Sequence, residues 1–190
     1  MKYYYFRATL PMLSMDAEPG LSFEEFRASC EAHLTRADLA RLDALTAGAA
    51  GPAGHGRFER AWWDAETELR NAVARLRATR LNRDARRHLR EQTGLRLWLE
   101  HGVTEAFGHR DPLARERALD RLRWTMLEEL ATREEPFGIV SVLTYALQLR
   151  IAERWAGLDS DRGARTVERW VGRERSRKSE VEKRAGTREF

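Results

Sequence analysis

The sequence contains little cysteine, glycine or proline. Its 190 residues include one cysteine, 13 glycines and five prolines. A single cysteine excludes a disulfide within the chain and is typical of proteins from a reducing compartment. The scarcity of turn-forming residues argues against a β-sandwich and against a disordered chain of low complexity.

Long apolar runs are also missing. No uncharged apolar stretch reaches about 18 residues, the length needed to cross a bilayer. The first residues, MKYYYFR, lack the apolar core and small-residue cleavage site of a secretion signal. We therefore expect a cytoplasmic protein that meets a membrane only through a partner complex.

Charge is abundant but nearly balanced over most of the chain. The net charge is +4, and residues 161–190, with ten basic and six acidic residues, carry all of this excess. Residues 1–160 carry 24 residues of each sign. Nucleic-acid-binding proteins usually show clustered, uncompensated positive charge, so the overall composition does not favour a nucleic acid as the partner.

One segment departs from this balance, because residues 70–90 hold eight arginines against one acid. This arginine-rich segment fits a solvated helix face paired with neighbouring acids, a docking surface for an acidic protein, or a nucleic-acid site. No RNP, KH, zinc-finger or basic-zipper pattern supports the third explanation. Arginine and partly exposed tryptophan are favoured interface anchors, and Trp62 and Trp63 are adjacent, so both cannot face one core. The candidate partner-binding residues are Trp63, Arg70, Arg77, Arg80, Arg83, Arg86 and Arg87.

The N-terminal part predicts one extended segment and two capped helices. Residues 3–10, YYYFRATL, are rich in aromatic residues and end at a proline, which favours an extended segment lying against helices as a hydrophobic anchor, with a helical first turn as the alternative. Ser22 followed by Glu25 is a capping box, and Thr35 followed by Asp38 offers a second cap.

The remaining pattern predicts further helices and two flexible regions. Residues 46–56 are small and rich in glycine, which indicates a linker. Expected next are a long helix from about Arg57 to Leu81, a short helix ended by Gly94, an apolar segment over 95–107, a helix opened by Asp111-Pro112, and a helix from Asp159 to Trp170. Residues 173–190 have few apolar side chains and are expected to be a disordered, charged tail.

The most apolar segment follows Pro136 and contains no charged residue before Arg150. A helix that is apolar on nearly every side belongs at the centre of a bundle. Its predicted ridge is Val140, Leu143, Leu147, Ile151 and Trp155. The sequence therefore predicts an all-α protein, a multi-helix bundle around a central apolar helix, with one domain over 1–172.

No catalytic constellation is evident. The sequence has no Gly-x-Ser-x-Gly elbow, no Cys–His signature and no phosphate-binding loop. His101, Glu105 and His109 have helical spacing, but two glycines weaken that helix and a fourth ligand is missing, so we expect no metal. Cys30 falls on the apolar side of its helix and is predicted to be a packed thiol. We expect a non-enzyme without a cofactor, although an unrecognised catalytic site is a further alternative.

Three stretches resemble a known group of proteins. They are MKYYYFRATLPMLS, ELRNAVARLRATRLNRD, and the run from ERALDRLRWTMLEEL through FGIVSVLTYALQLRIAERWAGLDSDRG. In this order they resemble a small uncharacterised bacterial family whose genes lie among those for V-type rotary ATPase subunits. The resemblance covers most of residues 1–172, except for the linker, and does not extend to the tail.

The resemblance implies a non-catalytic helical accessory or stalk component of an ion-translocating ATPase, with V-type ATPase subunits as partners. It carries over no active-site residue, because the family has no defined activity. The alternative is a helical nucleic-acid-binding or regulatory protein that uses the arginine-rich segment, and an adaptor for another partner also stays open.

Overall fold

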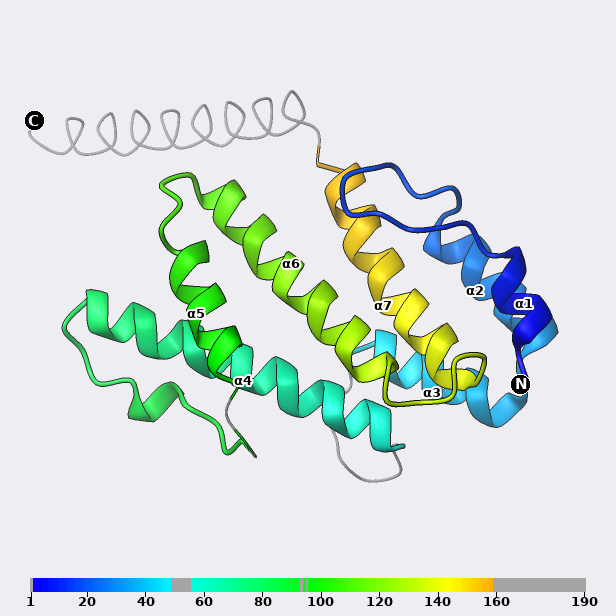
Figure 1. Ribbon diagram of the computed structural model, residues 1–190, viewed down its shortest axis with the longest axis horizontal. Helices are drawn as coiled ribbons and strands as arrows, with labels where there is room; N and C mark the ends of the chain where they lie inside the picture. Colours follow the sequence, from blue (N-terminus) through cyan, green and yellow to red (C-terminus); the bar gives the residue numbers. More distant parts are fainter. Residues whose placement is uncertain (1, 49–55, 93, 95, 159–190) are drawn as a thin grey trace, which may run out of the picture. The chain divides into compact units, whose positions relative to one another are not determined.

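The structure is a computed structural model that describes residues 2–48, 56–92, 94 and 96–158. Within these ranges it contains seven α-helices, one 3-10 helix and no strand, which confirms the all-α class (Figure 1). The helices are α1 (Tyr4–Thr9), α2 (Phe23–His33), α3 (Arg36–Thr46), α4 (Arg57–Arg80), the 3-10 helix η1 (Arg86–His88), α5 (Leu97–Ala106), α6 (Pro112–Ala131) and α7 (Ile139–Ala156). None of them is long and apolar enough to cross a membrane.

The chain divides into two compact units, Met1–Glu153 and Arg154–Phe190. All the sites considered below lie in the first unit. Most of the linker predicted over 46–56, the helix predicted over 159–170 and the tail predicted over 173–190 lie outside the described residues. A single domain over 1–172 therefore stays a prediction.

Both helix caps of the N-terminal part are confirmed. The Ser22 hydroxyl accepts a hydrogen bond from the Glu25 backbone N–H, and the Glu25 carboxylate accepts one from the Ser22 backbone N–H at 2.8 Å. The Thr35 hydroxyl accepts from the backbone N–H of Asp38. These side chains bind backbone donors that the first turn of a helix leaves free, which explains why α2 and α3 begin where the sequence predicts.

The extended conformation predicted for residues 3–10 is wrong, because this segment forms α1. Tyr3 and Phe6 are three residues apart, so a helical conformation places both on one side, where both are buried. The Phe6 ring stacks on Phe26 and His33, with centroid distances of 6.4 and 4.6 Å. The expected role as a hydrophobic anchor is confirmed, and packing overrides the strand preference of the aromatic residues.

Helices α4, α5 and α6 pack on one another in pairs. Gly102, in the middle of α5, allows a close approach to α6, because a Cβ atom there would lie 2.4 Å from a methyl carbon of Leu122. Glycine weakens a helix, but at this position it brings two helices together.

The short helix predicted before Gly94 is wrong, since the described residues between 83 and 94 contain only the three helical residues of η1. Asn82 adopts a left-handed conformation, with φ of 50°, and ends the helical path of α4. The Asn71 side chain then donates to the Arg90 carbonyl at 2.7 Å and accepts from the Arg90 N–H at 3.0 Å. A side chain of α4 therefore takes the hydrogen bonds that a helix here would form within itself.

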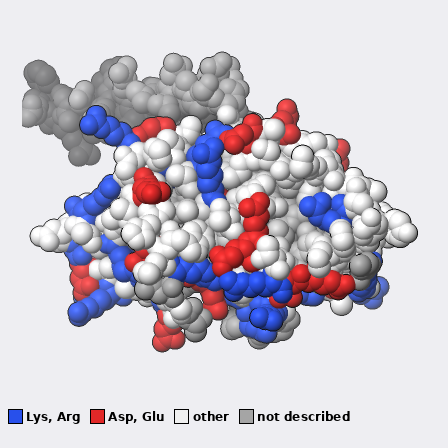
Figure 2. All heavy atoms as spheres, viewed as in Figure 1, with Lys and Arg blue, Asp and Glu red and all other residues white. Residues whose placement is uncertain are grey.

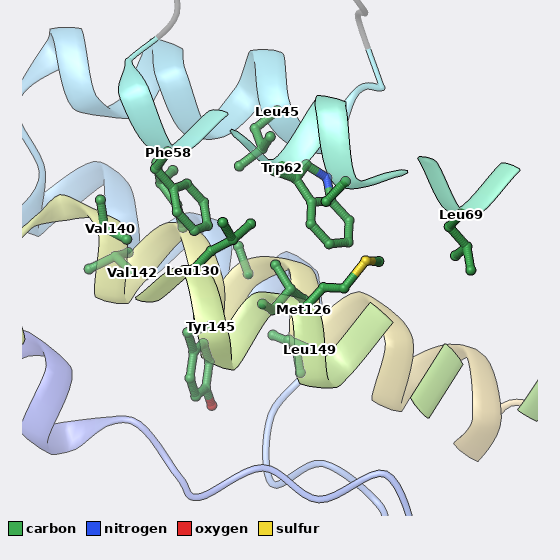
Figure 3. Packing of buried hydrophobic residues seen from close by; sticks show 14 of the residues in the cluster. Leu45, Phe58, Trp62, Leu69, Met126, Leu130, Val140, Val142, Tyr145 and Leu149 are labelled. Atoms are coloured by element: carbon green, nitrogen blue, oxygen red, sulfur yellow. The ribbon is translucent and has the colours of Figure 1, made fainter. Parts of the chain in front are cut away.

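The apolar helix after Pro136 forms as α7, and much of it is buried. Leu143 and Leu149 have no exposed surface, and Tyr145 is 1% exposed. Figure 3 shows Leu149 of this helix near Met126 of α6, whereas the Tyr145 ring points away from the labelled side chains of α4 and α6. Leu147, on the predicted ridge, is only partly buried. A central position for α7 stays a prediction.

Candidate partner-binding surface

A groove with a volume of about 540 Å³ lies between α4, the segment that follows it and α6. We name it the α4–α6 groove. Its apolar lining comes from Leu69, Val73, Ala74, Ala78, Leu81 and Leu119. Its charged and polar lining comes from Arg70, Arg77, Arg83, Asp84, His88, Glu116 and Arg123. Three of the six predicted arginines therefore meet at one apolar groove.

The helical repeat places the groove along one side of α4. Leu69, Val73 and Leu81 recur at helical spacing, and the last of them is 68% exposed at the end of the helix. Leu119 of α6, which is 3% exposed, lines the groove on the side opposite α4. The apolar stripe of α4 therefore continues beyond the part that α6 covers, and this leaves aliphatic surface open to a partner.

Two of the lining arginines are neutralised by buried acids. Glu66 accepts hydrogen bonds from Arg123 Nε and Nη2 at 3.0 and 3.1 Å, and from Arg70 Nε at 2.9 Å. Asp120 accepts from Arg123 Nη1 at 2.8 Å. Burial alone would lower the pKa of the Arg123 guanidinium, but the Glu66 and Asp120 carboxylates outweigh burial and raise it. The Arg123–Glu66 contact joins α6 to α4, so Arg123 has a structural role, whereas Arg70, whose side chain is 56% exposed, pairs with Glu66 within α4.

Three other arginines surround the Phe107 ring at the end of α5. The guanidinium carbons of Arg77, Arg80 and Arg115 lie 5.6, 5.3 and 4.9 Å from its centroid. Arg80 donates to the Phe107 carbonyl at 2.8 Å and Arg115 donates to the His109 carbonyl at 3.1 Å. Such bonds satisfy carbonyls that the end of α5 leaves free.

These three arginines form an uncompensated positive cluster. No carboxylate in the described part of the chain forms an ion pair with Arg77, Arg80 or Arg115. Arg77 belongs both to this cluster and to the lining of the α4–α6 groove. The cluster therefore places positive charge at the rim of an apolar groove.

The last three predicted arginines follow the end of α4 and are exposed. Arg83 lines the groove, whereas Arg86 and Arg87 lie in η1. Arg86 Nε lies 4.0 Å from Asp84 Oδ1, and its backbone N–H donates to the same carboxylate at 2.9 Å. The six arginines are therefore divided: Arg70 pairs with Glu66, Arg77 and Arg83 line the groove, Arg80 contacts Phe107, and Arg86 and Arg87 lie in η1.

Trp63 is partly buried while Trp62 is buried, as their adjacency predicts. The indole Nε1 of Trp63 is buried without a hydrogen-bond partner among the described residues. Trp63 precedes Arg70 by seven residues and therefore lies on the same stripe of α4, but it does not line the groove. The structure thus separates Trp63 from Arg77 and Arg83.

Phe107, Arg115 and Arg123 are not among the predicted partner-binding residues, although they lie at this surface. Arg123 has a signal in the sequence, because Glu66 falls within the apolar stripe of α4, and an acid in a buried stripe requires a cation. Phe107 and Arg115 have no such signal, because only the packing of α4, α5 and α6 brings them to Arg77.

The other titratable groups give no second chemical site. Among the residues that the structure describes, no three His, Cys, Asp or Glu side chains are arranged to hold a metal ion. His101, Glu105 and His109 are all exposed. Cys30 is completely buried, and burial raises the pKa of its thiol to about 12, so it is packed as predicted.

Charges of both signs alternate on the face shown in Figure 2, with uncharged surface between them. This face therefore does not show one continuous basic region. A local feature such as the α4–α6 groove distinguishes the surface better than its average charge does.

Part of the chain matches a known family model. Residues 96–176 match a family model described as a protein of unknown function, DUF2764. The matched region includes α5, α6 and α7, and with them Phe107, Arg115 and Arg123, but not α4. No curated protein matches the chain. No solved structure matches it either.

Proposed function

We propose that this protein is a non-catalytic helical accessory or stalk component of a bacterial V-type ATPase that acts through protein–protein contacts. The observation that carries the proposal is the α4–α6 groove, where an aliphatic floor lies beside arginines without acidic partners in the described part of the chain. Exposed apolar surface bordered by charge is typical of a protein-binding site.

The occupant that fits this groove is an acidic amphipathic helix of another subunit. Leu69 of α4 and its C-cap residue Leu81 bound the part of the lining that α4 contributes, and they are twelve residues apart, which corresponds to about 18 Å, or roughly three helical turns. Apolar side chains of the partner helix would cover the aliphatic floor, and its carboxylates would bind Arg77 and Arg83. Because the three-turn length matches a helix, the groove favours a helical partner over a small molecule.

The ATPase assignment is supported by the resemblance of the three ordered stretches. The second stretch contains the part of α4 that lines the groove, and the third contains α7 and most of α6. The DUF2764 match overlaps the third stretch and carries no function of its own. The groove therefore supports partner binding, and the resemblance supports the identity of the partner.

Affinity purification from native membranes in mild detergent tests both parts. The full-length tagged protein should recover V-type ATPase subunits, identified by mass spectrometry. The variant Arg77→Glu/Arg83→Glu should lower their recovery at least tenfold. The matched control Arg36→Glu/Arg110→Glu removes the same charge at exposed positions away from the groove and should leave recovery unchanged.

Circular dichroism and the melting temperature confirm that each variant folds. Recovery without ATPase subunits contradicts the ATPase assignment. Equal recovery with the groove variant and the control variant contradicts the role of the groove.

Nucleic-acid binding is the second candidate, favoured by three exposed arginines within the five residues 83–87. Its signature is an affinity for a labelled oligonucleotide that falls steeply with salt concentration. The variant Arg86→Glu/Arg87→Glu should reduce that affinity while sparing recovery of a protein partner from the groove. Fluorescence polarisation at several salt concentrations measures the slope.

A further inference from the structure

A second cavity, of about 430 Å³, lies away from the arginine-rich segment. Its lining comes from α1, the end of α6, the connection to α7 and the first turns of α7. The polar side chains in this lining are Arg7, Ser141 and Thr144. The cavity therefore joins one cation and two hydroxyl groups from segments far apart in the sequence.

Arg7 is a partly buried cation without an acidic partner. Its guanidinium carbon lies 4.7 Å from the centroid of the Tyr145 ring, and no carboxylate among the described residues forms an ion pair with it. Burial lowers the pKa of the Arg7 guanidinium, while the Tyr145 hydroxyl opposes this effect only in part. Desolvated cations in proteins are usually paired with an anion, so the charge of Arg7 is uncompensated.

Thr144 adds an unused donor to the same cavity. It is 7% exposed, and its hydroxyl oxygen has no hydrogen-bond partner among the described residues. The Ser141 hydroxyl differs, because it donates to the Gly138 carbonyl at 2.8 Å. Buried polar groups are nearly always hydrogen-bonded. A bound ligand would therefore supply the hydrogen-bond partner that the described residues do not give the Thr144 hydroxyl.

The Tyr145 hydroxyl is also buried without a hydrogen-bond partner in the described residues. Figure 3 shows it at the end of the ring that points away from the packed side chains. Bound water would satisfy a hydroxyl group, but water would not neutralise Arg7. Tyr145 does not line the cavity, whereas an anion there would neutralise Arg7 and accept a hydrogen bond from the Thr144 hydroxyl.

We propose that the cavity lined by Arg7 and Thr144 binds an oxyanion, either a carboxylate or a phosphate group. The forked guanidinium supplies the charge and directed N–H donors, and the Thr144 hydroxyl supplies a further donor. The site is independent of the α4–α6 groove, because the two cavities share no lining residue.

Ligand-dependent stabilisation of the full-length protein tests this site. The melting temperature is measured against increasing inorganic phosphate, and separately against acetate, with chloride at matched ionic strength as the reference. A ligand that binds only the folded state raises the melting temperature with a saturating dependence on its concentration. We expect a saturable rise with at least one of the two oxyanions and none with chloride.

Thr144→Val separates binding from structure, because valine has nearly the shape of threonine but no hydroxyl. Without ligand it should melt at or above the temperature of the native protein, since it removes an unsatisfied buried group. It should nevertheless weaken oxyanion binding about tenfold. Arg7→Gln should abolish binding, and Arg110→Gln, which removes an exposed arginine elsewhere, should leave it unchanged.

The two ligands identify the source of the oxyanion. Saturation with phosphate alone indicates a phosphate group, saturation with acetate alone indicates a carboxylate such as an acidic side chain, and saturation with both supports a general oxyanion site. Absence of a saturable shift with either ligand overturns the proposal. An unchanged affinity in Thr144→Val overturns it as well, even if Arg7→Gln does not fold.

Discussion

Helices α4 and α7 fill the interior in different ways. The buried residues of α7 are uncharged, and Leu143, Leu149 and Tyr145 are among the most deeply buried. Those of α4 include three glutamates, of which even the most exposed has only 5% of its surface open to solvent. They are Glu59, Glu66 and Glu68.

Each buried glutamate of α4 binds an arginine of a different element. Arg41 of α3 binds Glu59 at 2.6 Å, and Arg123 of α6 binds Glu66 at 3.0 Å. The third pair joins Glu68 to Arg96, just before α5, at 2.5 Å. We infer that these pairs determine which element faces each turn of α4, because apolar contacts alone have little directional preference.

The largest effect is expected where a charge enters the apolar interior of α7. Leu143→Asp places a carboxylate at a site with no exposed surface, so it should cost about 5 kcal/mol or more and leave the protein largely unfolded. Leu147→Asp, on the same helix but partly exposed, should cost only about 1–2 kcal/mol. Circular dichroism with urea denaturation measures both. Equal losses would show that α7 is buried on both sides.

The next largest effect is expected when the arginine that pairs with a buried glutamate of α4 is removed. Arg123→Met leaves Glu66 and Asp120 buried without their shared cation, and breaking a buried pair in this way costs about 3–5 kcal/mol. Adding Glu66→Gln to this variant should restore part of the stability, because it removes a buried carboxylate that would keep only the partly exposed Arg70 as its cation. Urea denaturation at neutral pH measures the difference. If Arg123→Met alone is harmless, the pairs of α4 do not determine its packing.

The elements that the sequence predicts correctly are those whose signals are local. Caps such as Ser22 with Glu25, and the proline after Asp111, act within one turn, so they predict the helix starts correctly. The helix at residues 4–9 has no such local signal, because its conformation depends on the burial of Tyr3 and Phe6 against distant residues. Local chemistry is visible in the sequence, whereas packing between distant segments is not.

The candidate site follows the same rule. The arginine-rich segment predicts positive charge, but the sequence does not show that Arg70 binds a buried acid while Arg77 faces the groove. The Arg7 cavity was not predicted at all, because it depends on α1 meeting α7 across more than 130 residues. The residue types are therefore predictable, while their separation into structural and exposed groups requires the fold.

A smaller effect is expected at Asp38, which ties α1 to α3. Burial alone would raise the pKa of this carboxyl, but hydrogen bonds from Lys2, Tyr3 and Thr35 outweigh burial and lower the pKa to about 2. The unfolded chain has a value of about 3.9, so the stabilisation, about 2–3 kcal/mol, is complete above about pH 5 and is lost as the pH falls through 4 to 2 and below. Urea denaturation between pH 2 and 6 should show this loss.

The matched variant Asp38→Asn should be less stable at neutral pH and lack this part of the acid dependence. Tyr3→Phe should reproduce a smaller part of the effect, because it removes the hydroxyl that donates to Asp38 at 2.5 Å. An acid dependence that is the same in Asp38→Asn and the native protein would contradict the assignment of the pH effect to this contact.

The smallest effect is expected at the exposed pair of Arg133 and Glu129, which gives the reference for the buried pairs of α4. The two side chains lie 2.5 Å apart at helical spacing and are 56% and 35% exposed. Solvent screens such a pair and both side chains lose conformational freedom, so Arg133→Ala should cost less than about 0.5 kcal/mol. Urea denaturation at low and high salt measures this cost. A loss as large as that of Arg123→Met would mean that neither burial nor the number of partners explains the difference, since Arg123 binds two buried acids and Arg133 binds one partly exposed acid.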